Sequence, residues 1–324
     1  MPSFQHLLLK QFLTAAAVPL ARRKPSVGAI RLAMEAGALF QFMPWRVNLE
    51  SFQLDNRLEA EWLRPRAAHP TRVLLYLHGG GYVLGSLNTH RSLVGSLALR
   101  CELNVLTINY RKAPDHPFPA ALDDARRAYR WLLRQGYQPQ DIVVGGDSAG
   151  GGLALALLLA LRDAGEALPA AGIGLSPWTD LNLPVSILRR VSQEETLLLE
   201  ALQMRTWGPL YAHKTALTHP LLSPAQADLH GLPPLLIQIS TAEVLYDDVV
   251  KFARKARAAG VPVTLQPFEG LVHWWHLFWR VVPEARQALD QVAGFLTQLW
   301  ATQAKATAVL PVAERRPTTR RRAA

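Results

Sequence analysis

Between residues 45 and 300, short apolar runs alternate with longer segments whose apolar residues recur at helical spacing. Each run has the length expected of a strand, and the continuous ones are typical of strands buried on both faces. The predicted strands are RVLLYLH (72–78), NVLTINY (104–110), DIVVGGD (141–147), AAGIGLSPW (170–178), PPLLIQIS (233–240) and VPVTLQPFEG (261–270).

The segments between these strands predict helices near 89–101 and over 120–136, 149–165, 245–260 and 283–300. Strands that alternate with helices indicate β-α-β units, so we expect an α/β fold with a mostly parallel sheet. Two earlier strands, RVNLESFQL and RLEAEWLR, are joined by a short polar turn and should be antiparallel. The last run contains two prolines, which favour an edge strand, and pairing across that edge would make a homodimer.

Two segments do not follow the alternation of strands and helices. Residues 1–44 and 181–231 are rich in Leu, Ala and Arg, and this composition predicts helices. We expect them to form a cap over a core built from 45–180 and 232–303. Residues 304–324 end in a basic Pro/Thr/Ala sequence that cannot pack a core, and we expect a disordered tail.

The chain has 324 residues, 49% of them hydrophobic, and a net charge of +10. The last eleven residues alone contribute +4, as five Arg less one Glu, and no basic stripe is interleaved with aromatic residues. We therefore expect no nucleic-acid partner. The single cysteine, Cys101, rules out an internal disulfide and suits a cytoplasmic location.

The N-terminus has no basic start, and Lys10 interrupts its apolar run, so it does not read as a secretory signal. Leu7, Leu8, Phe12 and Val18 fit an amphipathic helix packed on the protein. Contact of this helix with a membrane surface is the alternative. No run reaches the roughly 18 apolar residues of a membrane span, so we expect no stable insertion.

Candidate chemistry begins at a G-x-S-x-G sequence, Gly146 to Gly150, set between a predicted strand and a predicted helix. A sharp strand-to-helix corner needs small neighbours, and it would lift the hydroxyl of Ser148 above the carboxyl edge of the sheet. A phosphate-binding loop would need Lys and Ser/Thr after the last glycine. Gly151-Gly152-Leu153 stands there instead, so we favour a nucleophile.

A serine nucleophile needs a base and an orienting acid. The loop after strand 233–240 offers Glu243, Asp247 and Asp248, and the loop after 261–270 offers His273, with His276 as its competitor. The order serine, acid, histidine is that of α/β-hydrolases. HGGGY (78–82) follows the first buried strand and predicts an oxyanion hole from the N–H groups of Gly80, Gly81 and Ala149.

These motifs together resemble the hormone-sensitive-lipase-like family of α/β-hydrolases, the microbial carboxylesterases. The matching sequences, in family order, are HGGGY (78–82), NYRKAPDHPFPAALDDA (109–125), GDSAGG (146–151), SPWTDL (176–181), AEVLYDD (242–248) and EGLVH (269–273). The resemblance implies ester hydrolysis without cofactor or metal, with Ser148 as nucleophile and His273 as base. Many members carry Asp in the acid position, which Glu243 fills here, ahead of Asp247.

The resemblance also implies a small ester substrate and a helical cap. Candidate pocket walls are the aromatic residues near the catalytic positions, each of which could equally be core: Tyr82, Trp178, Trp207, Trp274 and Trp275. Bulky aromatics near the nucleophile would limit the acyl chain to about C2–C8. An amidase, deacetylase or lactonase would use the same site. A non-catalytic binder on this fold is disfavoured because His273 is present. No cluster has metal-ligand spacing.

Overall fold

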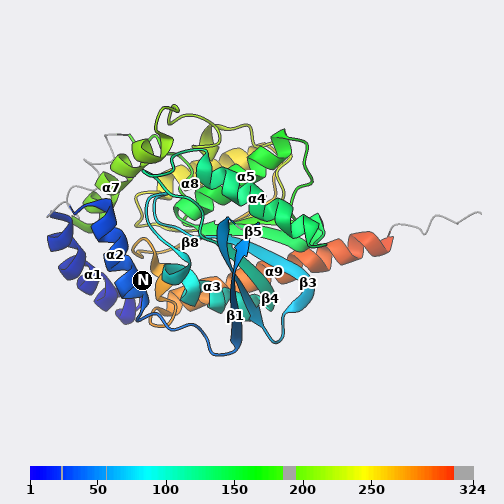
Figure 1. Cartoon of the computed structure of the whole chain (residues 1–324), viewed down its shortest axis with the longest axis horizontal. Helices are drawn as coiled ribbons and strands as arrows, with labels where there is room; N and C mark the ends of the chain where they lie inside the picture. The colour runs from blue at the N-terminus through cyan, green and yellow to red at the C-terminus, as the bar shows by residue number, and fades with distance from the viewer. Residues whose placement is uncertain (23–24, 56, 185–194, 310–324) are drawn as a thin grey trace, which may run out of the picture.

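The computed structural model describes residues 1–22, 25–55, 57–184 and 195–309, which fold around one eight-stranded sheet (Figure 1). The strand order is β1-β2-β4-β3-β5-β6-β7-β8. The strands are β1 (Val47–Leu54), β2 (Leu58–Pro65), β3 (His69–Leu77), β4 (Leu103–Ile108), β5 (Ile142–Asp147), β6 (Ala171–Leu175), β7 (Leu235–Ser240) and β8 (Val263–Phe268).

The sheet is parallel from β4 to β8, and β2 is antiparallel to both of its neighbours. This confirms the predicted antiparallel pair and the mostly parallel sheet. Strand β8 lies at one edge, as its prolines indicated. A homodimer formed through β8 stays a prediction.

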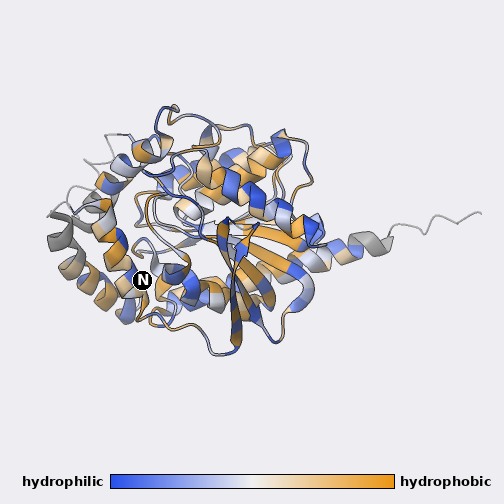
Figure 2. Ribbon diagram, viewed as in Figure 1, coloured by the Kyte–Doolittle hydropathy of each residue, from blue (hydrophilic) through white to orange (hydrophobic). Residues whose placement is uncertain are grey.

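Helices cover both faces of the sheet, so the interior strands are apolar on both sides (Figure 2). In β3, Val73 and Leu75 pack with one set of helices, and Leu74 and Tyr76 pack with the other. The first set is α4 (Ala120–Arg134), α5 (Ala149–Asp163) and α8 (Tyr246–Ala258); the second is α3 (Leu87–Cys101) and α9 (Pro283–Val309).

The segments predicted as a cap contribute α1 (Phe4–Arg22), α2 (Val27–Ala38) and α7 (Glu195–Ala212). Helix α1 packs against α7, although some 180 residues separate them in sequence, and both lie at the left in Figure 1. At the other end of the chain, α9 runs to Val309, whereas the sequence placed the start of the tail at 304. The rest of that predicted tail, 310–324, lies outside the described residues.

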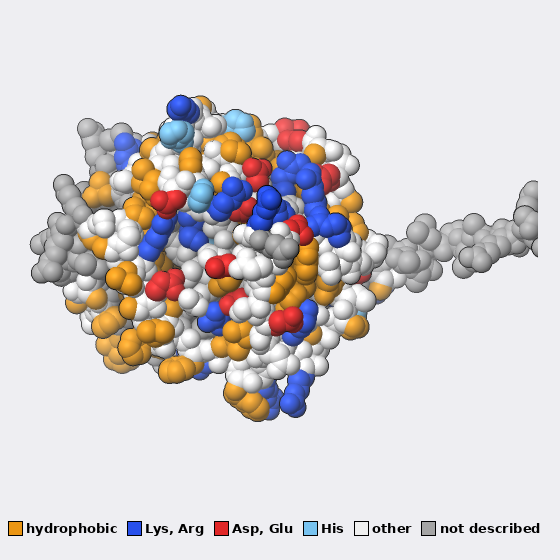
Figure 3. All heavy atoms as spheres, viewed as in Figure 1, with side chains coloured by type: hydrophobic (Ala, Val, Ile, Leu, Met, Phe, Trp, Pro, Cys, Tyr) orange, Lys and Arg blue, Asp and Glu red, His pale blue; other side chains and the backbone are white. Residues whose placement is uncertain are grey.

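The prediction that Leu7, Leu8 and Phe12 form the packed face of the first helix is wrong. These side chains are 46%, 50% and 68% exposed, and Figure 3 shows hydrophobic side chains gathered at the lower left, over α1 and α2. Helix α1 is apolar on nearly every side, so the sequence alone could not choose the face that packs. The face that turns inward carries His6, which is fully buried. The side chain of Val18 lies outside the described residues.

Short 3-10 turns complete the described elements: η1 (Pro139–Asp141), η2 (Pro224–Gln226) and η3 (Trp275–Phe278). Within the described ranges, no helix combines the length and apolar character needed to cross a membrane. The carboxyl ends of the parallel strands all meet at one side of the sheet, where ligands bind in folds of this kind. The loops after β3, β5, β6, β7 and β8 therefore decide what the protein can do.

Candidate active site

Ser148 occupies the corner between β5 and α5 with φ +51° and ψ −121°, a backbone conformation that non-glycine residues rarely adopt. Its neighbours must be small for the corner to form. A methyl group at either Gly146 or Gly150 would collide with the carbonyl oxygen of Leu77 in β3. The two glycines thus permit α5 to start directly behind the strand, which leaves the serine hydroxyl at the end of the sheet.

The imidazole of His273 lies between Ser148 and Glu243. Its Nε2 is 2.8 Å from Ser148 Oγ, and its Nδ1 is 2.6 Å from Glu243 Oε2. All three residues are buried, with 4%, 5% and 3% exposure for Ser148, His273 and Glu243. The structure therefore brings together the three side chains that the sequence selected, from loops after β5, β7 and β8. A hydroxyl held in this way can pass its proton to the imidazole, and the carboxylate can stabilise the imidazolium.

The second oxygen of Glu243 is also hydrogen-bonded. Oε1 accepts from the Ser176 hydroxyl at 2.7 Å and from the Ser240 N–H at 2.9 Å. Ser176 follows β6 directly and has a positive φ of 49°. Sequence reasoning missed this residue, although it lies in the SPWTDL motif. With Oε1 held by two donors, the carboxylate has one oxygen left to face His273.

Two contacts hold the loop that carries His273. Leu271 both donates to and accepts from the Ser240 hydroxyl, at 2.8 Å in each direction. The N–H of Val272 donates to His6 Nε2 at 3.0 Å, so α1 reaches back to this loop. Burial lowers the pKa of His6, which favours the neutral imidazole that can accept this bond. No sequence motif marks His6.

The competing residues lie elsewhere. His276 bonds Gln238 Oε1 through Nε2 at 3.1 Å, and burial lowers its pKa to about 3, so it stays neutral. Asp247 and Asp248 lie in the first turn of α8, where negative charge is favourable. Of the three acids considered, the structure sets Glu243 against His273.

The glycine loop after β3 turns tightly beside the serine corner. Gly80 and Gly81 have φ values of +121° and +63°, and the N–H groups of Val83 and Leu84 both donate to the Gly80 carbonyl. In the part of the chain that the structure describes, no acceptor is bonded to the N–H of Gly80, Gly81 or Ala149. These three donors are those that the sequence predicted for an oxyanion.

A buried carboxylate that the sequence analysis gave no role links this loop to the corner. Asp147 accepts from the Tyr76 hydroxyl at 2.7 Å and from the Gly79 N–H at 3.0 Å, and it lies 3.2 Å from His90 Nε2. Burial by itself would raise the pKa of Asp147, but the His90 imidazole and the Tyr76 hydroxyl outweigh it and hold the pKa at about 2. Asp147 is thus ionised and fixes Gly79 next to Ser148.

His78 supports the same loop. Its Nδ1–H donates to the Gly79 carbonyl at 2.8 Å, and its ring stacks on Tyr110 at 4.2 Å. Burial lowers the pKa of His78 well below its usual value, so the ring is neutral and serves as a fixed support.

The predicted aromatic walls divide into two groups. Trp207 of α7 lies against Gly81, and Trp274 is 39% exposed beside His273, with ring centroids 5.7 Å apart. Trp207 is itself 8% exposed, and the other three are more completely buried: Tyr82 stacks on Tyr211 at 3.9 Å, Trp178 is enclosed and bonds the Asp180 carbonyl, and Trp275 packs on Phe268. Trp207 and Trp274 are therefore the better candidates for contact with a ligand.

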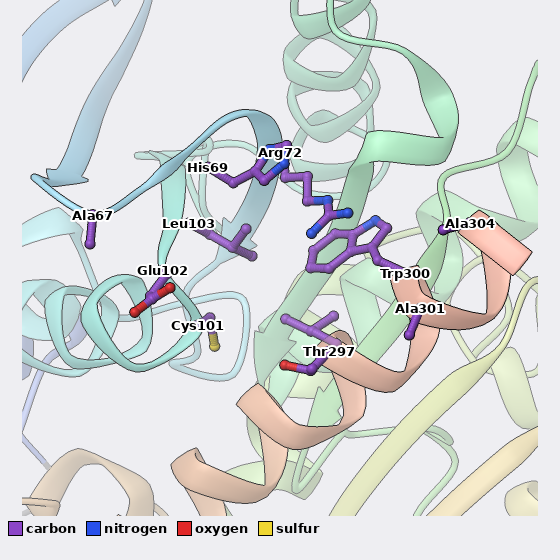
Figure 4. A pocket seen from close by; sticks show the side chains of 11 residues that line it. Ala67, His69, Arg72, Cys101, Glu102, Leu103, Thr297, Trp300, Ala301 and Ala304 are labelled. Carbon is purple, nitrogen blue, oxygen red and sulfur yellow. The ribbon is translucent and has the colours of Figure 1, made fainter.

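A cavity of about 410 Å³ lies away from these residues, between the start of β3, the end of α3 and α9 (Figure 4). It is lined by Arg72, Cys101 and Trp300, among others, and Arg72 lies over the Trp300 ring at 4.5 Å. Because Ser148 is at the carboxyl end of the strands, this cavity is at the opposite end of the sheet. Within the described ranges, no group of three or more His, Cys, Asp or Glu side chains is arranged to hold a metal ion.

Comparison with known proteins agrees with this geometry. A family model described as the alpha/beta hydrolase fold matches residues 74–277. The chain is 47% identical over 238 residues to an acetyl-hydrolase from Streptomyces hygroscopicus, covering 73% of this chain and 79% of that protein. It is 41% identical over 233 residues to an esterase from Acinetobacter venetianus, covering 72% and 77%.

Among solved structures, EstE5 soaked with p-nitrophenyl butyrate has a TM-score of 0.86 at 38% identity, covering 92% of this chain and 99% of that one. An esterase of the bacterial hormone-sensitive lipase family has a TM-score of 0.80 at 39% identity, covering 85% and 92%. The chain belongs to the α/β-hydrolase family, and its resemblance to hormone-sensitive-lipase-like esterases is confirmed.

Ser176 generates a prediction about the acid. Replacing Ser176 by Ala removes one donor from Glu243 and leaves that carboxylate less constrained beside His273. Because a hydrogen bond to a charged group is worth about 1.5–3 kcal/mol, we expect kcat to fall about tenfold or more. KM should change less than about twofold, since the hydroxyl bonds Glu243. Steady-state kinetics with a soluble ester measures both constants.

The control is Ser96→Ala. This serine is also buried, but it lies in α3 and not in the loop that holds Glu243. We expect its kcat to stay close to that of the wild type. Equal losses of kcat in the two variants would contradict a specific role for Ser176.

Asp147 generates a prediction about stability. Its folded pKa of about 2 lies below the usual 3.8, so the ionised carboxylate stabilises the fold by about 2 kcal/mol above pH 4, and this is lost as the pH falls toward 2. We expect Asp147→Asn to be less stable than the wild type by about 2–4 kcal/mol at pH 7. The difference, measured by urea unfolding, should narrow between pH 5 and pH 2.5. A difference that is constant with pH would contradict the assignment.

Proposed function

We propose that the protein is a serine carboxylesterase that hydrolyses short- to medium-chain acyl esters through an acyl-enzyme. In this proposal Ser148 is the nucleophile, His273 the base and Glu243 the acid. The observation that carries it is the position of the His273 ring, within hydrogen-bond distance of both Ser148 Oγ and Glu243 Oε2. A histidine held between a hydroxyl and a carboxylate is the arrangement that activates a serine.

At the level of reaction class, the protein is a carboxylic ester hydrolase. It belongs to the α/β-hydrolase family, and the relatives and solved structures that it matches carry the names esterase and acetyl-hydrolase. The residue roles and the covalent intermediate are the finer part of the proposal.

In the first half of the proposed reaction, Ser148 Oγ attacks the ester carbonyl while His273 Nε2 takes the hydroxyl proton. The carbonyl oxygen becomes an oxyanion, which the N–H groups of Gly80, Gly81 and Ala149 would stabilise. Ala149 is the first residue of α5, so the positive end of the helix dipole adds to this effect. His273 then returns the proton to the leaving alcohol, and the C–O bond to the alcohol breaks.

In the second half, water adds to the acyl-enzyme and His273 takes one of its protons. The second tetrahedral intermediate forms at the same donors, and it collapses when His273 protonates Ser148 Oγ. The carboxylic acid leaves and the enzyme is regenerated. Glu243 keeps its charge throughout and holds the His273 Nδ1–H, so the ring presents Nε2 to the reacting atoms.

The acyl chain should be short because a bulky ring lies beside the oxyanion loop. The ring of Trp207 lies directly against Gly81, next to the place where an acyl group would sit. The names of the relatives point the same way, since they include an acetyl-hydrolase and an ethyl acetate hydrolase from Pseudomonas putida. We expect acetate and butyrate esters to be hydrolysed faster than esters of about C10 and above.

The first test replaces the nucleophile. Ser148→Ala should lower kcat for p-nitrophenyl acetate or butyrate by about 10⁴-fold or more, with the circular dichroism spectrum unchanged. An organophosphate should label the wild type at Ser148 and leave the variant unlabelled, which mass spectrometry can measure. Residual activity near that of the wild type would refute the assignment.

The second test separates the two candidate acids. Glu243→Gln keeps the shape of the side chain but removes the charge that stabilises the imidazolium, and we expect kcat to fall by about 10²–10⁴-fold. Asp247→Asn is the matched control because Asp247 lies in the first turn of α8, and its kcat should stay within about threefold of the wild type. Kinetics of both variants on one ester decide the question; the reverse pattern would assign the acid to Asp247.

A further inference from the structure

Exposed apolar side chains are concentrated in one segment of the chain. Fourteen large hydrophobic side chains are exposed in the part of the chain with described side chains, and ten of them belong to the first 45 residues. Scattered apolar residues on a surface need no explanation, but a concentration of this kind marks a contact surface. We call it the N-terminal apolar surface; it consists of Phe4, Leu7, Leu8, Phe12, Leu32, Leu39, Phe40, Phe42 and Trp45.

The part on α1 follows one face of the helix. Phe4, Leu8 and Phe12 are spaced four residues apart, so their side chains line up along the helix, and they are 71%, 50% and 68% exposed. The opposite face carries His6, which is buried and bonds Val272. Helix α1 is therefore held in place by its inner face, and its apolar outer face is turned to solvent.

The part after α2 is more exposed still. Phe40 and Phe42 are 80% and 70% exposed, and Trp45 is 84% exposed. The guanidinium of Arg46 lies over the Trp45 ring at 4.7 Å, and Arg280 donates to the Phe42 carbonyl. Aromatic rings beside arginines on an exposed surface are typical of side chains that bind at the interface of a lipid bilayer.

The charge of this segment is strongly one-sided. The first 46 residues contain six basic side chains and one acidic one: Lys10, Arg22, Arg23, Lys24, Arg31 and Arg46 against Glu35. Of these, Arg31 is paired with Asp115 at 2.8 Å. The segment thus has a net charge of +5, as six less one, and carries an apolar surface. It complements a partner whose outer layer is negatively charged and whose interior is apolar. A bilayer that contains anionic lipids has these properties.

We propose that the N-terminal apolar surface docks on the surface of anionic lipid bilayers. The contact is peripheral, because no helix in the described ranges could cross a membrane. Phe4, Phe12, Phe40, Phe42 and Trp45 enter the boundary between head groups and acyl chains, and the net positive charge of the segment attracts it to the anionic head groups. This inference goes beyond the proposed function and does not depend on it, because binding is measured without catalysis.

Docking in this orientation has a consequence for the site. Helix α1 packs on α7, which carries Trp207, and it bonds the loop of His273 through His6. Helix α1, which contacts the bilayer in this proposal, therefore also contacts the helix that carries Trp207 and the loop that carries His273. Docking would therefore bring the candidate active site close to ester substrates that are dissolved in or near the membrane.

The experiment measures binding of the full chain to vesicles by sedimentation. Vesicles of phosphatidylglycerol and phosphatidylcholine in equal parts should bind the wild type, and vesicles of phosphatidylcholine alone should bind it at least about fivefold more weakly. Raising the salt from 0.05 to 0.5 M should weaken the first interaction. The double variant Phe40→Ser/Phe42→Ser should bind about tenfold or more weakly, because it loses two apolar side chains from the interface.

The matched control is Leu49→Ser/Leu202→Ser, which removes two exposed leucines outside this surface. Its vesicle binding should stay within about twofold of the wild type, and both variants should keep the wild-type circular dichroism spectrum. The proposal is overturned if the wild type does not bind the anionic vesicles, or if the two double variants lose binding equally. It is also overturned if Phe40→Ser/Phe42→Ser turns a dimer into a monomer in sedimentation velocity while vesicle binding is absent, since a second copy would then cover the surface.

Discussion

The position of one imidazole ring is the constraint on which the rest of the structure depends. His273 must reach Ser148 with one nitrogen and Glu243 with the other, although these residues come from three loops. The strands that carry the loops end at the same level: Asp147 pairs with Leu175, Leu175 with Gln238, and Ser240 with Phe268. Because parallel strands place their carboxyl ends together, the register of the sheet sets the spacing of the triad before any side chain is considered.

The loops then need rigid supports, and these are mostly polar and buried. Ser176 and Ser240 hold Glu243 and the His273 loop, and Asp147 joins the glycine loop to the serine corner. Each support bonds across two loops, so that no loop is fixed by its own residues alone. In a buried site such bonds are stronger than in water, and leaving one partner unpaired is costly. Residues that take no part in the chemistry therefore fix the positions of the reacting atoms.

The sequence was sufficient to predict the parts of the site in which local backbone geometry restricts the choice of residue or chain order restricts its position. The strand-to-helix corner at Ser148 demands small neighbours, the oxyanion loop demands glycines, and the acid and base must follow later strands, so all of these could be predicted. Ser176 and His6 could not, because their partners lie 67 and 266 residues away and a serine or histidine has no local pattern that reveals such a contact. The aromatic residues stayed open between pocket wall and core for a related reason: nearness in sequence to a catalytic residue does not decide whether a ring such as Trp178 faces a pocket or the core.

Helix α1 shows how one element can serve two purposes that place different demands on its sequence. Its inner face must be specific, because the bond from Val272 to His6 needs a neutral imidazole at one position. Its outer face needs only to be apolar, since a bilayer accepts any arrangement of Phe and Leu side chains. A helix that is apolar on nearly every side, with a single histidine pointing inward, satisfies both demands at once. For the same reason the hydrophobic pattern of α1 is ambiguous in the sequence and becomes informative only when the buried histidine is located.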